Sequence, residues 1–180
     1  MERNLTHIAL FAALTAILGL VPQISLASGV PITAQSLGIM LCGTVLGARR
    51  GALAVLLFLA LVAAGLPLLT GGRGGLGVFA GPSVGFLIGF PLAAFVAGWV
   101  VQRTTLPLGL AAGAGSVIGG IGLLYPLGII GMALVLKISL TEAAVIAMAF
   151  LPGDLVKCVL AALVTRAIAR MRPGSVLSRA

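Results

Sequence analysis

The last apolar segment of the chain begins Leu151-Pro152-Gly153-Asp154-Leu155-Val156-Lys157 and continues to Ala169. Pro152 suits the first turn of a helix, because the N–H that proline lacks has no acceptor there. The segment therefore predicts a helix that starts near Pro152 and carries Asp154 in its first turn. Positions three apart share a helix face, so the Asp154 carboxylate and the Lys157 ammonium group are expected to be neighbours.

This acid–base pair has a structural and a functional interpretation. A carboxylate in the first helical turn stabilises an exposed helix N-terminus by roughly 0.3–1 kcal/mol. That leaves Lys157 unexplained, because a charge near the middle of a membrane helix costs at least about 2.5–3.5 kcal/mol on insertion scales. Ligand binding by Asp154 and Lys157 is the favoured hypothesis. The alternative is a structural ion pair or a lysine that extends to the interface.

The composition places this segment in an integral membrane protein. The 180 residues are 61% hydrophobic and only 8% charged, with a mean hydropathy of +1.28, whereas about a quarter of the residues in a soluble domain are charged. Long apolar runs interrupted by Gly and Pro favour packed helices, since the strands of a membrane barrel alternate apolar and polar residues. We expect an all-α integral membrane protein with one membrane-embedded domain over residues 1–180.

Six apolar runs predict about six transmembrane helices, over residues 5–21, 35–48, 51–69, 78–101, 107–136 and 151–169. The second run is shorter than the about 20 residues of a full span, so Thr33 and Gln35 are expected at membrane depth with polar partners. The fifth is too long for one straight crossing, and its glycines predict a kinked or tilted span. Ser139-Leu140-Thr141-Glu142 is a capping-box pattern that predicts a short helix from residue 140 to about 150.

Basic residues mark the ends of these runs and give a net charge of +8. Their positions follow the positive-inside rule rather than the pattern of a DNA-binding face, so the lipid bilayer and not nucleic acid is the expected partner. With both termini cytoplasmic, only Arg73 and Lys137 fall outside. The inner arginines are Arg3, Arg49, Arg50, Arg103, Arg166, Arg170, Arg172 and Arg179.

Two further stretches are candidates for specific contacts. Residues 70–77 read TGGRGGLG; they lack the Gly-Lys-Ser/Thr end of a P-loop, so we expect a loop folded over a cavity, with Arg73 at its pocket or rim, rather than a nucleotide site. Small side chains four residues apart let a second helix approach closely. In the first run they form a candidate docking face of Ala9, Ala12, Ala13 and Ala16.

Binding is a better hypothesis than catalysis for the remaining polar residues. Paired carboxylates, a Ser-His-Asp set and a metal-ligand cluster are all missing from the sequence, so neither enzyme activity nor a metal or other cofactor is expected. A pocket with an acceptor, an amide, a hydroxyl and cations suits a small acid with an N–H-rich ring. The candidates are Thr33, Gln35, Arg73, Asp154 and Lys157, all toward the predicted outer face. Tyr125 is predicted as an interfacial anchor, with pocket lining as the alternative.

Energy for transport is expected to come from a separate partner. Transporters driven by ion gradients usually carry internal repeats and several intramembrane acids. This sequence shows no evident repeat, and only Asp154 qualifies as such an acid.

Three stretches, in order and at matching spacing, resemble the BioY family, the biotin-binding (S) subunits of energy-coupling-factor (ECF) transporters. They are Val30-Pro31-Ile32-Thr33-Ala34-Gln35-Ser36-Leu37, Gly74-Gly75-Leu76 with Phe79-Ala80-Gly81-Pro82-Ser83-Val84-Gly85-Phe86-Leu87-Ile88-Gly89-Phe90, and Pro152-Gly153-Asp154-Leu155-Val156-Lys157. The resemblance implies a six-helix, multi-pass protein of the bacterial cytoplasmic membrane that binds biotin from outside. It also implies a transmembrane coupling (T) protein and two ABC-type ATPases as partners, with ATP hydrolysed by those ATPases.

The same resemblance suggests residue roles. Asp154 would accept from the biotin ureido ring, and Lys157 would donate to that ring or orient Asp154. Thr33 and Gln35 would complete the polar set, and the alanine face would meet the coupling protein. An S subunit for another vitamin, or a self-sufficient secondary transporter of a small organic acid, is the alternative.

The sequence departs from the family pattern at three places. Ser83-Val84 stands where Thr-Gly is usual, Phe86 where Tyr is common, and Ala34 where a larger apolar residue is usual. Phe86 lacks the tyrosine hydroxyl, so no hydrogen bond is expected from it.

Overall fold

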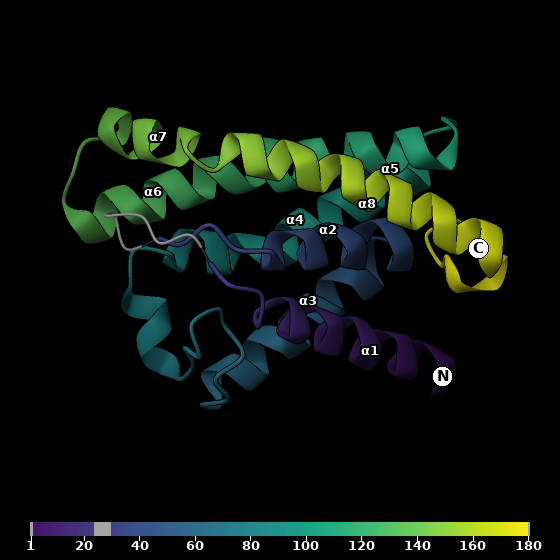
Figure 1. Ribbon diagram of the computed structural model, residues 1–180, viewed down its shortest axis with the longest axis horizontal. Coiled ribbons are helices and arrows are strands. Elements are labelled where there is room, and N and C mark those ends of the chain that lie inside the picture. The colour runs from purple at the N-terminus through teal and green to yellow at the C-terminus, as the bar shows by residue number, and fades with distance from the viewer. Residues whose placement is uncertain (1, 24–29, 180) are drawn as a thin grey trace.

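The chain folds into helices that run roughly along one long axis (Figure 1). The computed structural model describes residues 2–23 and 30–179; this part of the chain contains no β-strand, and an isolated β-bridge joins Leu69 to Arg73. The all-α prediction is confirmed. The elements are α1 (Glu2–Leu18), α2 (Gln35–Leu46), α3 (Ala48–Ala63), η1 (Leu76–Ala80), α4 (Val84–Arg103), α5 (Leu108–Val117), η2 (Ile118–Leu123), α6 (Leu124–Leu136), α7 (Leu140–Met148), α8 (Leu151–Met171) and η3 (Pro173–Ser175).

Each predicted apolar run contains a helix, but the helices differ in length. Among the described residues, α4 and the continuous 29-residue stretch Leu108–Leu136 are long and apolar enough to cross a bilayer, and α7 with α8 qualifies as one span bent by 55°. Helices α1 and α2 are shorter apolar helices. Figure 1 places both chain ends at the same end of the long axis. The count of six spans and the cytoplasmic side of the termini stay predictions.

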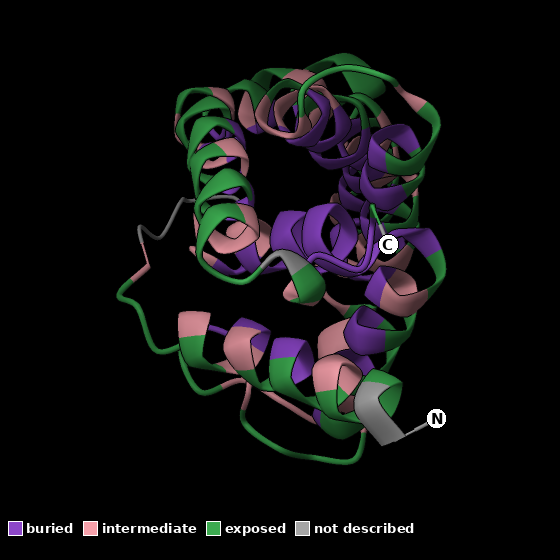
Figure 2. Cartoon of the chain, turned by 90° about the vertical axis from the view of Figure 1, so that its right-hand side faces the viewer, coloured by how far each residue is buried: buried purple, intermediate pink, exposed green. Residues whose placement is uncertain are grey.

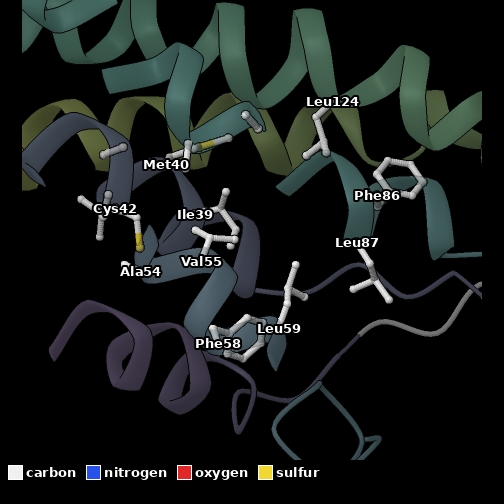
Figure 3. Close-up of a cluster of buried hydrophobic side chains, with 14 of the residues drawn as sticks. Ile39, Met40, Cys42, Ala54, Val55, Phe58, Leu59, Phe86, Leu87 and Leu124 are labelled. Atoms are coloured by element: carbon white, nitrogen blue, oxygen red, sulfur yellow. The ribbon is translucent and has the colours of Figure 1, made fainter. Parts of the chain in front are cut away.

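Helices α2 and α4 lie between α1 with α3 on one side and α5 to α8 on the other (Figure 1). Ten of the twelve residues of α2 are buried, so this helix forms the centre of the core. Figure 3 shows its Ile39, Met40 and Cys42 among side chains from α3, α4 and α6. Seen along the axis, buried residues face the interior and exposed residues face outward (Figure 2). Many of the exposed residues are Leu, Ile or Val, as expected for helices that contact lipid.

Two predicted boundaries between the third and fourth runs are wrong. Helix α3 ends at Ala63 instead of 69, because Gly65 has φ +105° and Pro67 disfavours helical backbone in the residue before it. Helix α4 begins at Val84 instead of 78, directly after Pro82 and Ser83. The residues between the two helices form the glycine-rich loop and η1.

The fifth run, predicted as a kinked or tilted span, has an irregular middle, while its kink or tilt stays a prediction. The stretch is one continuous helix whose middle, Ile118–Leu123, is π-helical, a local widening that often marks functional sites and bends helices. Glycine also lets α4 approach α6 closely: a Cβ at Gly85 would meet the backbone of Leu127 and Gly131. Gly89 faces Leu124 and Leu127, whereas Gly81, the third glycine of this four-residue spacing, precedes α4, and a Cβ there would make only an ordinary contact with the Val78 carbonyl at 3.6 Å.

The junction of α7 and α8 follows local sequence rules. The Ser139 hydroxyl accepts from the Glu142 N–H at 3.2 Å, and the Ser139 N–H donates to Glu142 Oε2 at 2.8 Å, so the predicted capping box is present at α7. Helix α8 starts at Leu151 with Pro152 in its first turn, as predicted. The bend between the two helices brings Phe150 and the first turns of α8 to the interior, where the polar site lies.

Candidate ligand-binding site

The predicted ion pair forms at the start of α8. Lys157 Nζ lies 2.8 Å from Asp154 Oδ1, and only 14% of the lysine and 9% of the aspartate side chain is exposed. It is the only ion pair found in the described part of the chain. A charge buried to this degree needs further hydrogen bonds, because each loses most of its contact with water.

Ser36 and Tyr125 supply those bonds. The Ser36 hydroxyl donates to Asp154 Oδ1 at 3.1 Å and accepts from Lys157 Nζ at 2.9 Å. The Tyr125 hydroxyl donates to Asp154 Oδ2 at 2.9 Å. Each carboxylate oxygen has about two acceptor positions and an ammonium group has three donors. Within this cluster, Oδ2 therefore keeps one acceptor position and Lys157 keeps one donor for a further partner.

A cavity opens beside this cluster. It holds about 590 Å³ of empty space, a figure that includes open solvent. Its polar lining comes from the stretch before α2, the first turn of α2, the glycine-rich loop, the residue before α4, and α8: Thr33, Gln35, Ser36, Arg73, Ser83, Asp154 and Lys157. Its apolar lining is Val30, Pro31, Ile32, Leu69, Leu87, Leu124, Phe86, Phe90 and Phe150.

Aromatic rings form one wall. Phe86 of α4 meets Phe150 edge to face, with ring centroids 5.9 Å apart, and Tyr125 in the same way at 6.5 Å. The edge-to-face geometry holds these rings in fixed positions beside the carboxylate. Phe86 thus contributes packing and no hydrogen bond, as expected from the departure at this position.

The amide of Gln35 is fully used by the protein. Its Nε2 donates to the Leu68 and Thr15 carbonyls at 3.0 and 3.3 Å, and its Oε1 accepts from the Thr70 N–H and hydroxyl at 3.1 and 2.9 Å. Gln35 lines the cavity but joins α2 to α1 and to the loop beyond α3. The sequence indicated that this amide at membrane depth needs partners, and the partners found are protein groups.

Thr33 and Arg73 line the cavity with a hydroxyl and a guanidinium group. Thr33 Oγ1 accepts from the Gln35 backbone N–H at 3.3 Å. Arg73 Nε donates to the Thr70 carbonyl at 3.2 Å, and its terminal nitrogens have no hydrogen-bond partner among the described residues. Gly71 and Gly72 take φ of +79° and +69°, which lets the loop turn back so that Leu69 and Arg73 exchange backbone hydrogen bonds. The loop thus folds over the cavity.

Tyr125 and the alanine face differ in part from expectation. Tyr125 is buried and bonds to Asp154, but it is not among the residues that line the cavity.

Of the four alanines, Ala9 and Ala13 are exposed and Ala16 is half-buried. Ala12 is only 4% exposed within the core, because α1 turns this side toward α2 and α3. Ala12 thus packs inside the chain, unlike Ala9 and Ala13, and its part in docking stays an untested prediction.

Sequence reasoning missed Ser36 and the aromatic wall. The signal for Ser36 was a hydroxyl directly beside Gln35 at the start of a short apolar run. Its partners are 118 and 121 positions away, so no local pattern links them. In the part of the chain that the structure describes, no group of three or more His, Cys, Asp or Glu side chains is placed to hold a metal ion. Cys42 and Cys158 are free and buried.

Comparisons with known proteins bear on this site. A model of the BioY family matches residues 2–174. "Biotin transporter BioY" of Rhodobacter capsulatus is 58% identical over 189 aligned residues, covering 99% of this chain and 100% of the relative. Its counterpart in Rhizobium etli is 52% identical over 177 residues, covering 92% of each. A crystal structure of the S-component for biotin from an ECF-type ABC transporter matches with a TM-score of 0.92 and 32% identity, covering 99% of this chain and 96% of that one.

Proposed function

The chain belongs to the BioY family, and we propose that it captures biotin as the substrate-binding component of an ECF-type transporter. The observation that carries this proposal is the buried carboxylate–ammonium pair beside a cavity whose lining is mostly apolar. Biotin has a ureido ring with two N–H donors and one carbonyl, an apolar fused ring, and a tail that ends in a carboxylate. The unused acceptor position on Asp154 and the unused donor of Lys157 complement the N–H and carbonyl of that ring.

The remaining groups fit the rest of the ligand. Phe86, Phe90 and Phe150 offer aromatic surfaces for the apolar rings. The unpaired terminal nitrogens of Arg73 suit the tail carboxylate, which accepts strong charge-assisted bonds from guanidinium. Thr33 adds a hydroxyl at the cavity wall. Tyr125 acts as a positioning residue that fixes the Asp154 carboxylate, and Gln35 holds the wall in place rather than touching the ligand.

The transport assembly follows from the same proposal. The chain forms a single membrane-embedded domain in the bacterial cytoplasmic membrane, with both termini cytoplasmic, and is itself no enzyme. It acts with a transmembrane coupling (T) protein and two ABC-type ATPases, which supply the energy. Exposed Ala9 and Ala13, one turn apart on α1, allow close approach of a helix of the coupling protein.

Equilibrium binding of labelled biotin to the purified full chain in detergent tests the proposed ligand, with excess unlabelled thiamine as the competitor control. The expected result is saturable, thiamine-insensitive binding of about one biotin per chain. Competition by thiamine or riboflavin stronger than by biotin would contradict it. Uptake into liposomes by the chain alone, driven by an ion gradient, would contradict the proposed dependence on ATPase partners.

A further inference from the structure

A second cavity lies between α5 and α8, at the end of the molecule where both chain ends lie (Figure 1). It encloses about 1050 Å³ of empty space, including open solvent. It is separate from the Asp154 site, which lies near the beginning of α8 rather than near its end. Its lining residues are Pro107, Leu108, Gly109, Leu110, Ala162, Leu163, Arg166, Ala169 and Arg170.

The charge in this cavity is uncompensated. Arg166 and Arg170 are four residues apart on α8, so they share a helix face. Both are exposed, and neither makes an ion pair or a side-chain hydrogen bond within the described part of the chain. The carboxylates of Asp154 and Glu142 are bonded elsewhere, to Lys157 and Ser139. The cavity therefore presents two guanidinium groups with all their donors available to an anion.

The walls of the same cavity are apolar. Leu110 of α5 and Leu163 of α8 are 64% and 56% exposed, and the small residues Gly109 and Ala162 lie between the helices. Such surface, on helices that cross a bilayer, faces acyl chains rather than water. Arginines at the end of such helices lie at the level of the lipid headgroups. One ligand class has both parts, an anionic phosphate joined to an acyl chain.

We propose that the α5–α8 cavity binds an anionic phospholipid, with Arg166 and Arg170 on the phosphate and an acyl chain along Leu110 and Leu163. The first turn of α5 also lines the cavity, and its N–H groups have no acceptor within the helix, which adds to the attraction for an anion. Helix α1, with the exposed Ala9 and Ala13, lies on the other side of α2 and α4 (Figure 1). Bound lipid therefore leaves the proposed docking face uncovered.

The test measures lipid retention by the purified full chain in uncharged detergent. Phosphatidylglycerol and phosphatidylcholine are titrated separately, and protein with bound lipid is counted by native mass spectrometry. Since a basic residue near an anionic membrane surface contributes about 1 kcal/mol, preference for phosphatidylglycerol should fall about fivefold in R166Q and about 25-fold in R166Q/R170Q. R172Q is the matched control: it loses the same charge at the end of the same helix, but outside the cavity.

Several results would overturn the proposal. Equal loss of preference in R172Q and R166Q would mean that net charge alone attracts the lipid. Unchanged preference in R166Q/R170Q would exclude the cavity, and equal retention of both lipids by the unaltered chain would exclude recognition of the anion. If soluble glycerophosphoglycerol raises the melting temperature as much as phosphatidylglycerol does, the site binds a small phosphate and not a lipid. Unchanged melting temperature and helical circular dichroism show that each variant has folded.

Discussion

At the scale of single residues, the site depends on a carboxylate with bonds on both oxygens. Asp154→Asn removes the charge while keeping the shape, and a charge-assisted bond in a buried site is worth about 1.5–3 kcal/mol. We therefore expect biotin binding to weaken about tenfold or more, measured as Kd with labelled biotin in detergent. Glu142→Gln should leave Kd unchanged, because Glu142 caps α7 at an exposed position. Equal losses in the two variants would refute the assigned site.

Asp154→Asn also leaves the buried Lys157 without its counter-ion, so correct folding of this variant must be shown separately. A melting temperature near that of the unaltered protein, with loss of binding, assigns the loss to the ligand contact. If the melting temperature falls sharply, the double variant Asp154→Asn/Lys157→Met is tested next. It removes both charges and should restore folding but not biotin binding.

Ser36 and Tyr125 are expected to act through Asp154. Ser36→Ala removes one donor to the carboxylate and one acceptor for Lys157, and Tyr125→Phe removes one donor while the ring contact with Phe86 remains. At about 0.5–1.5 kcal/mol per bond, Tyr125→Phe should weaken biotin binding by about twofold to twelvefold, and Ser36→Ala, which removes two bonds, by about fivefold or more. Ser116→Ala is the control, since that buried hydroxyl has no partner in the described structure. Unchanged Kd in both test variants would refute the positioning role.

At the scale of elements, the contact of α4 with α6 depends on a glycine. A methyl group at Gly85 meets the backbone of Leu127 and Gly131, which cannot move aside as a flexible side chain would. Gly85→Ala should destabilise the protein by about 1–3 kcal/mol and lower its melting temperature. Gly81→Ala places the same methyl group in ordinary contact with the Val78 carbonyl alone, at 3.6 Å, and should leave the melting temperature unchanged. A similar fall in both would show that this contact is not the cause.

At the scale of the whole molecule, α1 has two sides with different expected roles. Ala9→Leu and Ala13→Leu enlarge exposed residues, so biotin binding and melting temperature should be retained while copurification of the coupling protein is lost. Ala12→Leu overpacks the core and should lower the melting temperature. Copurification that survives both Ala9→Leu and Ala13→Leu would place the docking face elsewhere.

The parts of the fold that were predicted correctly rest on local rules. Pro152 in the first turn of α8 and the capping box at Ser139 depend on residues within four positions of one another. The start of α4 was predicted too early because the apolar residues 78–80 join the apolar run of the helix without a polar break. In the structure these residues belong to the 3-10 turn η1, and α4 begins only after Pro82. Hydropathy reports burial or lipid contact, and it does not distinguish a helix from a short turn beside it.

The candidate site was predictable in its charges but not in its contacts. Asp154 and Lys157 lie three positions apart, so their pairing follows from helix geometry alone. Which groups complete the pair depends on how α2 and α6 pack against α8, and this brings Ser36 and Tyr125 from distant parts of the chain. The polar side chain of Gln35 at membrane depth predicted a hydrogen-bonding partner. The sequence could not tell whether that partner is a ligand or the protein, because carbonyl groups of either satisfy an amide equally well.

That amide has a mechanical consequence. Gln35 Nε2 ties the Thr15 carbonyl of α1 and the Leu68 carbonyl of the loop to one side chain, while its oxygen holds Thr70. If α1 moves and the loop over the cavity does not, some of these hydrogen bonds break. Each buried group that loses its partner costs about 1–3 kcal/mol. Helix α1, which carries the proposed docking residues, is thus linked through Gln35 to the loop at the mouth of the cavity. A movement of one favours a movement of the other.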